Sequence, residues 1–459
     1  MSKFFRYFIF LILLNNCSLD TKSGIWTDKK NLILGESNDI SKIFIKDELL
    51  EREFNANLKI KLTSKLINNS FVNNHTNNNG RINYDGDLKK ISKFKFSKID
   101  NFEYYEPELI FESGNLIFND KIGSIIKFDP NSKILWRKNY YNKSEKKLRP
   151  ILTMGKSGEN LIVTDNISKY YVLDLKSGDL LWSNYNSSPF NSQIKTYKNK
   201  FFIIDFNNIL RCISIKDGKE LWNIKASNTF IKSQKKLSII IVKNVLYFNN
   251  STGDITAVDI NSGNMLWQIP TQNSTIYEDT FLLKNSNIVA NDEMIIFSNN
   301  KNELYSIDLR NGNLRWKQNI NSSVQPSIIN NLIFTITNEG FLMIVNSKTG
   351  DIVRITDIFK KSNQGSKIRF LSDKKTNSLY IFEKKRKKKS NRPKFKPTGF
   401  IVGKNNIYLT TDHGRLFIIN VESGKTISII KIDNKKISSP FVLNNNLFVI
   451  KDDSIIKLD

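Results

Sequence analysis

Few side chains of the kinds that carry catalysis or bind metals occur in this chain of 459 residues. Its two histidines are His75, in an Asn-rich stretch, and His413, in a predicted turn. Two histidines are too few for most metal clusters, and neither stands in a pattern typical of a Ser-His-Asp triad. Cys212 falls inside an apolar strand pattern, where a buried, inert thiol is expected. No Gly-rich phosphate loop follows a strand pattern and precedes a helix pattern. The sequence therefore predicts no catalytic residue, no metal, no cofactor and no enzyme.

The other cysteine, Cys17, ends a segment with the pattern of an export signal. Lys3 and Arg6 precede the unbroken apolar run 8–14, which is too short to span a bilayer as a helix. The residues that lead into Cys17 resemble the lipobox of bacterial lipoproteins, although Asn16 stands where a small residue is usual. By this resemblance, residues 1–16 are a signal peptide and Cys17 is the lipidation site. The alternative is an ordinary secretory signal followed by an incidental cysteine.

The net charge of +26 comes from 70 Lys and Arg against 44 Asp and Glu. Half of this excess lies in residues 360–396, which contain 15 Lys and Arg but only Asp373 and Glu383, a net of +13. Elsewhere the basic residues are spread evenly, so nucleic acid is not an expected partner. The 31 Phe and 15 Tyr are too many for a disordered chain, and the mean hydropathy of −0.36 suits a body that folds in water.

A repeat is the strongest signal in the chain. An apolar strand leads to Asp or Ser, then Gly four residues later, then Trp four further. The four complete copies are Asp174, Gly178, Trp182; Ser214, Gly218, Trp222; Asp259, Gly263, Trp267; and Asp308, Gly312, Trp316. Two copies lack the indole, Asn346, Gly350, Arg354 and Asn420, Gly424, Ser428, while an earlier one, Asp129 to Trp136, lacks the Gly, and the last stops at Asp459.

The spacing of these eight copies predicts the fold class. Their turns span 330 positions, and removing the 37 residues of the basic insertion leaves 293 over seven intervals, about 42 residues each. This is the length of a four-stranded propeller blade. The sequence predicts an all-β, eight-bladed β-propeller of four-stranded antiparallel blades with tryptophan-docking repeats.

The residue types in the repeat suit hairpins between packed sheets. Asp or Ser accepts hydrogen bonds from the following backbone N–H groups, and Gly supplies a positive φ. An indole repeated at fixed register is interpreted as a wedge between blades, not as a ligand platform. The predicted docking residues are Trp136, Trp182, Trp222, Trp267, Trp316, Gly178, Gly218, Gly263 and Gly312.

The last copy has no outer strand of its own, so an N-terminal strand is expected to close the ring. The alternating segment 91–99 is favoured, and 58–63 is the alternative. This gives three regions: the signal peptide 1–16, an Asn-rich tether 17–90, and a propeller 91–459 with the basic insertion 360–396.

Val258, Asp259, Gly263 and Trp267 together resemble the tryptophan-docking motif of quinoprotein-type propellers. With the lipobox and eight such blades, the chain resembles the BamB-like lipoproteins of the outer-membrane β-barrel assembly machinery. The resemblance implies a lipid-anchored scaffold on the periplasmic face of the outer membrane, a monomer within a hetero-complex. It implies binding to the periplasmic repeats of the barrel-inserting subunit and assistance to unfolded outer-membrane proteins.

Two alternatives stay open. A quinone-dependent dehydrogenase shares the fold, but Asp165, Asp205 and Asp292 lack the companion spacing of a calcium loop and are more simply turn residues. The other is a propeller that serves a different envelope complex.

The basic insertion is the one departure with a possible function of its own. The run Lys384, Lys385, Arg386, Lys387, Lys388, Lys389 could contact anionic lipid headgroups or an acidic protein surface. A solvated loop is the simpler interpretation and the favoured one.

Overall fold

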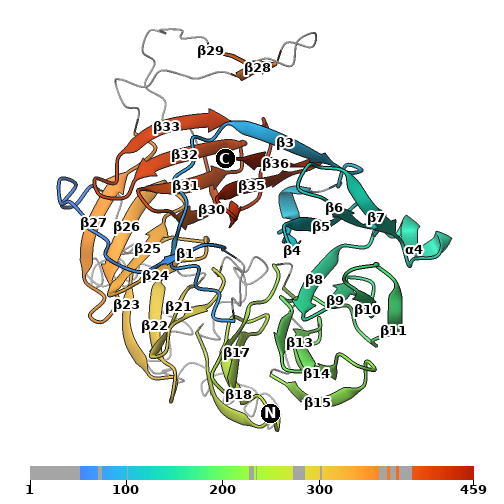
Figure 1. Ribbon diagram of the computed structural model, residues 1–459. Helices are drawn as coiled ribbons and strands as arrows, with labels where there is room; N and C mark the ends of the chain where they lie inside the picture. The colour runs from blue at the N-terminus through green and yellow to red at the C-terminus, as the bar shows by residue number, and fades with distance from the viewer. Residues whose placement is uncertain are drawn as a thin grey trace, which may run out of the picture. The chain divides into compact units, whose positions relative to one another are not determined.

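The computed structural model describes residues 52–70, 75–100, 102–226, 232–233, 235–271, 285–299, 302–360, 370–372, 379–381 and 395–459. The chain divides into two compact units, residues 1–49 and 50–459, and every described residue belongs to the second. This second unit is a ring of eight antiparallel sheets (Figure 1). The predicted all-β fold with eight four-stranded blades is confirmed.

Each blade is numbered in chain order, and its strands run from the middle of the ring to the rim. Blades 1 to 4 comprise β4 to β7 (Ile110–Glu112, Asn115–Asn119, Ile125–Phe128, Ile134–Lys138), β8 to β11 (Leu152–Ser157, Asn160–Asp165, Lys169–Asp174, Leu180–Tyr185), β12 to β15 (Lys195–Tyr197, Lys200–Ile204, Ile209–Ser214, Glu220–Lys225) and β16 to β19 (Ile239–Val242, Val245–Asn249, Ile255–Asp259, Met265–Ile269).

The second half of the ring repeats this order. Blades 5 to 8 comprise β20 to β23 (Val289–Ala290, Met294–Ser298, Leu304–Asp308, Leu314–Gln318), β24 to β27 (Ser327–Ile329, Leu332–Ile336, Phe341–Asn346, Ile352–Asp357), β30 to β33 (Pro397–Val402, Asn406–Thr411, Arg415–Asn420, Thr426–Lys431) and β34 to β36 with β3 (Phe441–Leu443, Asn446–Lys451, Ser454–Leu458, Lys90–Lys95). Short strands β1 (Leu66–Ile67) and β2 (Arg81–Ile82) extend blade 7 at its inner edge.

Three short elements lie outside the blades. They are the 3-10 helix η1 (Phe102–Tyr104), the helix α4 (Lys143–Lys147) and the hairpin of β28 (Phe370–Ser372) with β29 (Leu379–Ile381). Asn142 caps α4 by accepting a hydrogen bond from the Glu145 N–H. Among the residues that the structure describes, no helix has the length and apolar character that a bilayer crossing requires.

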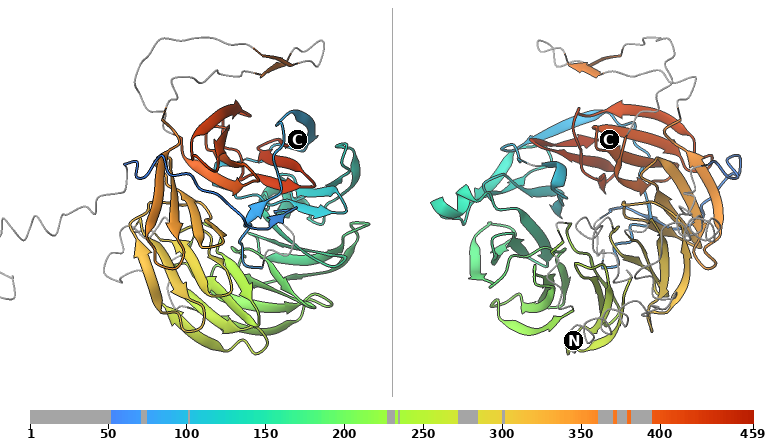
Figure 2. Two further views of the ribbon diagram at one scale, coloured as in Figure 1. Left: turned by 60° about the vertical axis from the view of Figure 1, so that its left-hand side comes forward. Right: turned by 180° about the vertical axis from the view of Figure 1, so that it is seen from behind.

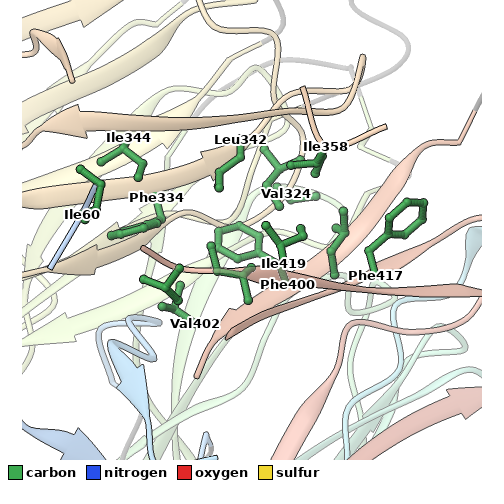
Figure 3. Packing of buried hydrophobic residues seen from close by; sticks show 14 of the residues in the cluster. Ile60, Val324, Phe334, Leu342, Ile344, Ile358, Phe400, Val402, Phe417 and Ile419 are labelled. Carbon is green, nitrogen blue, oxygen red and sulfur yellow. The ribbon is translucent and has the colours of Figure 1, made fainter. Parts of the chain in front are cut away.

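Apolar side chains fill the space between neighbouring blades. Between blades 6 and 7, Phe334 and Leu342 of blade 6 pack in one cluster with Phe400, Val402 and Ile419 of blade 7 (Figure 3). The outer strands differ, because one face of each meets solvent: β11 and β15 alternate exposed and half-buried residues.

The fourth strand of blade 8 comes from the N-terminal side of the propeller. β3 pairs antiparallel with β36, so that Phe94 lies opposite Ile455 (Figure 1). This strand overlaps the segment 91–99 favoured above. The alternative segment 58–63 forms no strand; its Ile60 packs between blades 6 and 7 instead.

Residues 52–70 and 75–89 fall within the segment expected to be a tether, yet they pack against the propeller. Phe54 forms an antiparallel bridge with Ile355 on the rim of blade 6, and β2 pairs parallel with β30 at the ring's inner edge. Figure 2 shows this segment, in blue, running from the rim into the ring. Part of this packing comes from asparagine amides, since those of Asn77 and Asn78 donate to backbone carbonyls of neighbouring blades.

Candidate functional site

Each docking glycine lies against the tryptophan of the preceding blade. A Cβ atom built on Gly263 would lie 2.7 Å from Trp222, and one on Gly312 would lie 2.9 Å from Trp267. The contacts repeat around the ring as Gly178 with Trp136, Gly218 with Trp182, and Gly350 with Trp316. All these glycines have positive φ, between 73° and 81°. Glycine is thus needed for two reasons: the left-handed backbone and the close approach of the indole.

The turns form as their chemistry predicts. The Asp174 carboxylate accepts hydrogen bonds from the N–H groups of Lys176 and Ser177, and the Gly178 N–H donates to the Asp174 carbonyl. Polar contacts also hold some indoles: the Trp182 Nε1–H donates to the Ile215 carbonyl at 2.8 Å, and the Trp316 Nε1–H donates to that of Ser347 at 2.9 Å. The indole N–H bonds of Trp136, Trp182 and Trp316 therefore join neighbouring blades.

Blade 6 carries Arg354 where the complete copies carry tryptophan. Its side chain is fully buried, and a Cβ atom on Gly424 would lie 2.7 Å from the guanidinium. The guanidinium donates to the carbonyls of Leu58 at 2.9 Å, Val421 at 3.1 Å and Glu422 at 2.5 Å. Burial lowers the pKa of Arg354 to about 10. The sequence showed that the indole is missing here but not that an arginine takes its place between the blades.

A cavity of about 1120 Å³ lies along the inner strands and is lined by parts of β4, β8, β12, β30 and β34. Two of its lining residues, Glu108 and Lys436, have polar partners. Lys236 forms an ion pair with Glu108 at 3.0 Å, and Lys436 donates to the carbonyls of Glu103 and Tyr105. Burial lowers the pKa of Lys195 in this wall to about 8.

The acidic residues weighed as an enzyme's ligands lie in turns. Asp165 accepts a hydrogen bond from the Tyr141 hydroxyl at 2.6 Å and others from the Ile167 and Lys169 N–H groups, and burial raises its pKa. Asp205 forms an ion pair with Arg211 at 2.9 Å. Asp292 is exposed in the turn that follows β20. Among the residues that the structure describes, these carboxylates form no group that could hold a metal ion.

The cysteine and the two histidines considered in the sequence analysis lie in different environments. Cys212 is fully buried, and burial raises the pKa of its thiol to about 12. The His413 imidazole is exposed and contacts Asp412, whereas His75 lies beside the cavity, where burial lowers its pKa. Within the described ranges, no group of three or more His, Cys, Asp or Glu could hold a metal ion.

Two predicted sites lie outside the described residues. One is Cys17, and the other is the basic run Lys384–Lys389. The ends of the basic insertion are described: it leaves β27 after Asp357 and returns at β30, and the rings of Phe359 and Phe395 meet with centroids 5.7 Å apart.

Comparison with known proteins identifies the family of this chain. The model of the family described as outer membrane protein assembly factor BamB matches residues 121–356, slightly more than half of the chain. The chain belongs to the BamB family. The match covers blades 2 to 6 and the last two strands of blade 1, including every docking tryptophan. No curated protein matched the sequence.

Solved structures share the fold at low sequence identity. BamB from Moraxella catarrhalis is 14% identical with a TM-score of 0.60, and the match covers 81% of this chain and all of that one. The computationally designed Ika8 protein is 10% identical, with a TM-score of 0.57 over 79% of this chain and 99% of its own. The C-terminal WD40 domain of Sif2 is 11% identical, with a TM-score of 0.54 over 83% and 99%. These likenesses show the propeller fold alone.

Proposed function

We propose that the protein is a non-enzymatic scaffold for outer-membrane protein assembly, on the periplasmic side of the outer membrane. The observation that carries this proposal is the BamB family match over residues 121–356. The proposed partner is the barrel-inserting subunit, bound through its periplasmic repeats, and the proposed clients are unfolded outer-membrane proteins. The protein would act as a monomer within this hetero-complex.

The chemistry of the described residues supports a scaffold. Asp165 and Asp205 are engaged in turn hydrogen bonds and an ion pair, and the Cys212 thiol is buried in apolar packing. No observation favours the quinone-dependent dehydrogenase. A propeller offers a scaffold a rigid ring with many loops, and these can vary without disturbing the sheets.

Affinity capture from native membranes tests the proposed partner. Tagged protein, solubilised in mild detergent, should recover the barrel-inserting subunit in amounts comparable to its own. A periplasmic lipoprotein outside this family, with the same tag, serves as the control. Recovery of another envelope complex, without any barrel-assembly subunit, would show that the propeller serves a different machine.

Lipid anchoring at Cys17 is proposed from the lipobox pattern. Cys17→Ser should abolish incorporation of labelled palmitate and release the protein from the membrane pellet. Cys212→Ser is the matched control, because the other cysteine is buried in the propeller and should leave labelling unchanged. Labelling that persists in Cys17→Ser would show that the lipid is attached elsewhere.

A further inference from the structure

The inner strands of five consecutive blades, 3 to 7, contact one extended segment, residues 75–84, which we call the strap. The Ile241 N–H of blade 4 donates to the His75 carbonyl at 2.8 Å, and the Ala290 N–H of blade 5 donates to the Thr76 carbonyl at 3.0 Å. On blade 7, Arg81 pairs with Val402 in parallel register. The strap thus adds backbone hydrogen bonds to strand edges that face the middle of the ring.

Asn77 is the most densely bonded residue of the strap. It is 3% exposed and adopts a positive φ of 59°. Its Nδ2 group lies 2.9 Å from the Ile288 carbonyl and 3.1 Å from Gln193 Oε1, while its Oδ1 atom accepts a hydrogen bond from Lys195 Nζ at 2.6 Å. The Gln325 side chain donates to its backbone carbonyl. This one residue therefore joins blades 3, 5 and 6.

Asn78 pairs with a strand in the way that a backbone amide would. Its Nδ2 group donates to the Ile328 carbonyl at 3.0 Å, and its Oδ1 atom accepts from the Ile328 N–H at 3.0 Å. Two apolar side chains then fix the end of the strap, since Ile82 and Tyr84 are both fully buried. The Tyr84 carbonyl accepts a hydrogen bond from the Lys404 N–H.

These bonds are of the kind by which sheets bind extended peptides. Backbone pairing supplies affinity, and a few side chains supply specificity. Here the specific elements are two adjacent amides, Asn77 and Asn78, and the apolar pair Ile82 and Tyr84. The cavity of about 1120 Å³ beside the strap leaves space along the inner strands of blades 1 and 2.

We propose that the middle of the ring is a binding site for an extended polypeptide with adjacent asparagines, which the chain fills with its own strap. Because strap and site belong to one chain, the strap is present at a high effective concentration, in the millimolar range for short linkers. A free peptide therefore binds only when the strap is weakened. This site is independent of the partner proposed above.

Hydrogen exchange at single amides in the full-length protein tests the site. In the double variant Asn77→Ala, Asn78→Ala, the Ile241, Ala290 and Ile328 amides should exchange at least about tenfold faster than in the unaltered protein. A synthetic peptide of residues 75–84, added at millimolar concentration, should restore their protection. The same peptide with alanine at both asparagine positions should not.

Two controls separate binding from general loosening. Asn83→Ala lies in the same strap, but the exposed Asn83 side chain donates to Asn68, outside the ring's inner strands, so the variant should leave the three amides unchanged. Amides of β9 in blade 2, which the strap does not touch, should also keep their rates. If the double variant does not fold, Asn78→Ala alone should speed exchange at Ile328 and spare Ile241 and Ala290.

The proposal is overturned by unchanged exchange in the variants. It is also overturned if the peptide gives no protection, or if the alanine-containing peptide protects equally well.

Discussion

At the residue scale, the docking glycines show how one position meets two separate demands. Gly263 has a φ of 77°, and the Trp222 indole leaves no room for a Cβ atom. Gly158 has a φ of 57°, but a Cβ atom there would meet nothing within 4 Å. Comparing the two glycines separates the cost of the backbone conformation from the cost of displacing the indole.

We predict that Gly263→Ala lowers the free energy of unfolding more than Gly158→Ala does. Alanine in the left-handed region should cost roughly 1–2 kcal/mol at either position. At Gly263 the displaced indole should add about 1–3 kcal/mol, in the range of an overpacked core. Urea denaturation of both variants measures the difference, and equal losses would mean that the indole moves aside freely.

Lys195 makes a pH-dependent contribution that can be given a sign. Burial lowers its pKa from 10.5 to about 8 in the folded chain. Below pH 8 the ammonium is charged in both states, so its burial penalty is fully present. Between about pH 8 and 10.5 the unfolded chain holds more protons than the folded chain, so stability from this residue rises with pH.

We therefore predict a different pH slope for Lys195→Met. Relative to this variant, the unaltered protein should gain stability from pH 8 to pH 10. Urea midpoints at several pH values provide the measurement, and Lys198→Met on the neighbouring exposed position is the control. Parallel curves for the unaltered protein and Lys195→Met would contradict the prediction.

At the element scale, β3 joins the last blade to the first. Phe94 is fully buried, and its ring meets those of Phe128 in blade 1 and Phe448 in blade 8, at centroid distances of 5.7 and 6.4 Å. One strand thus contributes to the packing of two blades that are far apart in sequence.

Removing the Phe94 phenyl group should loosen the packing of both blade 1 and blade 8. We predict that Phe94→Ala lowers the free energy of unfolding by about 3–5 kcal/mol, the usual loss for a buried phenylalanine. Lys95→Ala, on the exposed face of the same strand, should change it by less than about 0.5 kcal/mol. Thermal unfolding followed by circular dichroism compares them, and similar melting temperatures would show that β3 contributes little.

Sequence patterns predicted the repeating elements and missed individual contacts that follow no repeat. The interval between Asp174, Gly178 and Trp182 is set by hairpin geometry, so its recurrence yields blade number and turn position together. Arg354 occupies the docking position by donating to carbonyls, a role that composition cannot distinguish from a solvent-exposed arginine. The strap was missed because Asn78 binds the Ile328 backbone and Asn77 binds the Ile288 carbonyl, and backbone partners leave no mark on the sequence of the strands.

At the scale of the whole molecule, the positive charge is unevenly distributed, with half of the excess in residues 360–396. The ring contact between Phe359 and Phe395 brings the two ends of this insertion together. Loss of residues between these ends should therefore leave the blades intact, because the sheets on either side do not depend on the connection for their pairing.

Deleting Lys384–Lys389 tests whether this basic run binds anionic lipid. The melting temperature should stay within about 2 °C of the unaltered protein. If the run contacts anionic lipid, flotation with anionic liposomes should fall on deletion, and the difference should shrink at high salt. Equal flotation at both salt concentrations would mean that the run is a solvated loop.

The pairing of β3 with β36 also constrains how the molecule is made. Lys93 lies opposite Ile456, so a strand synthesised early finds its partner only after all the blades between them have emerged. Until then, the edge of β36 and the aromatic face of β3 are open to wrong partners. The slowest folding step should accordingly be the pairing of β3 with β36.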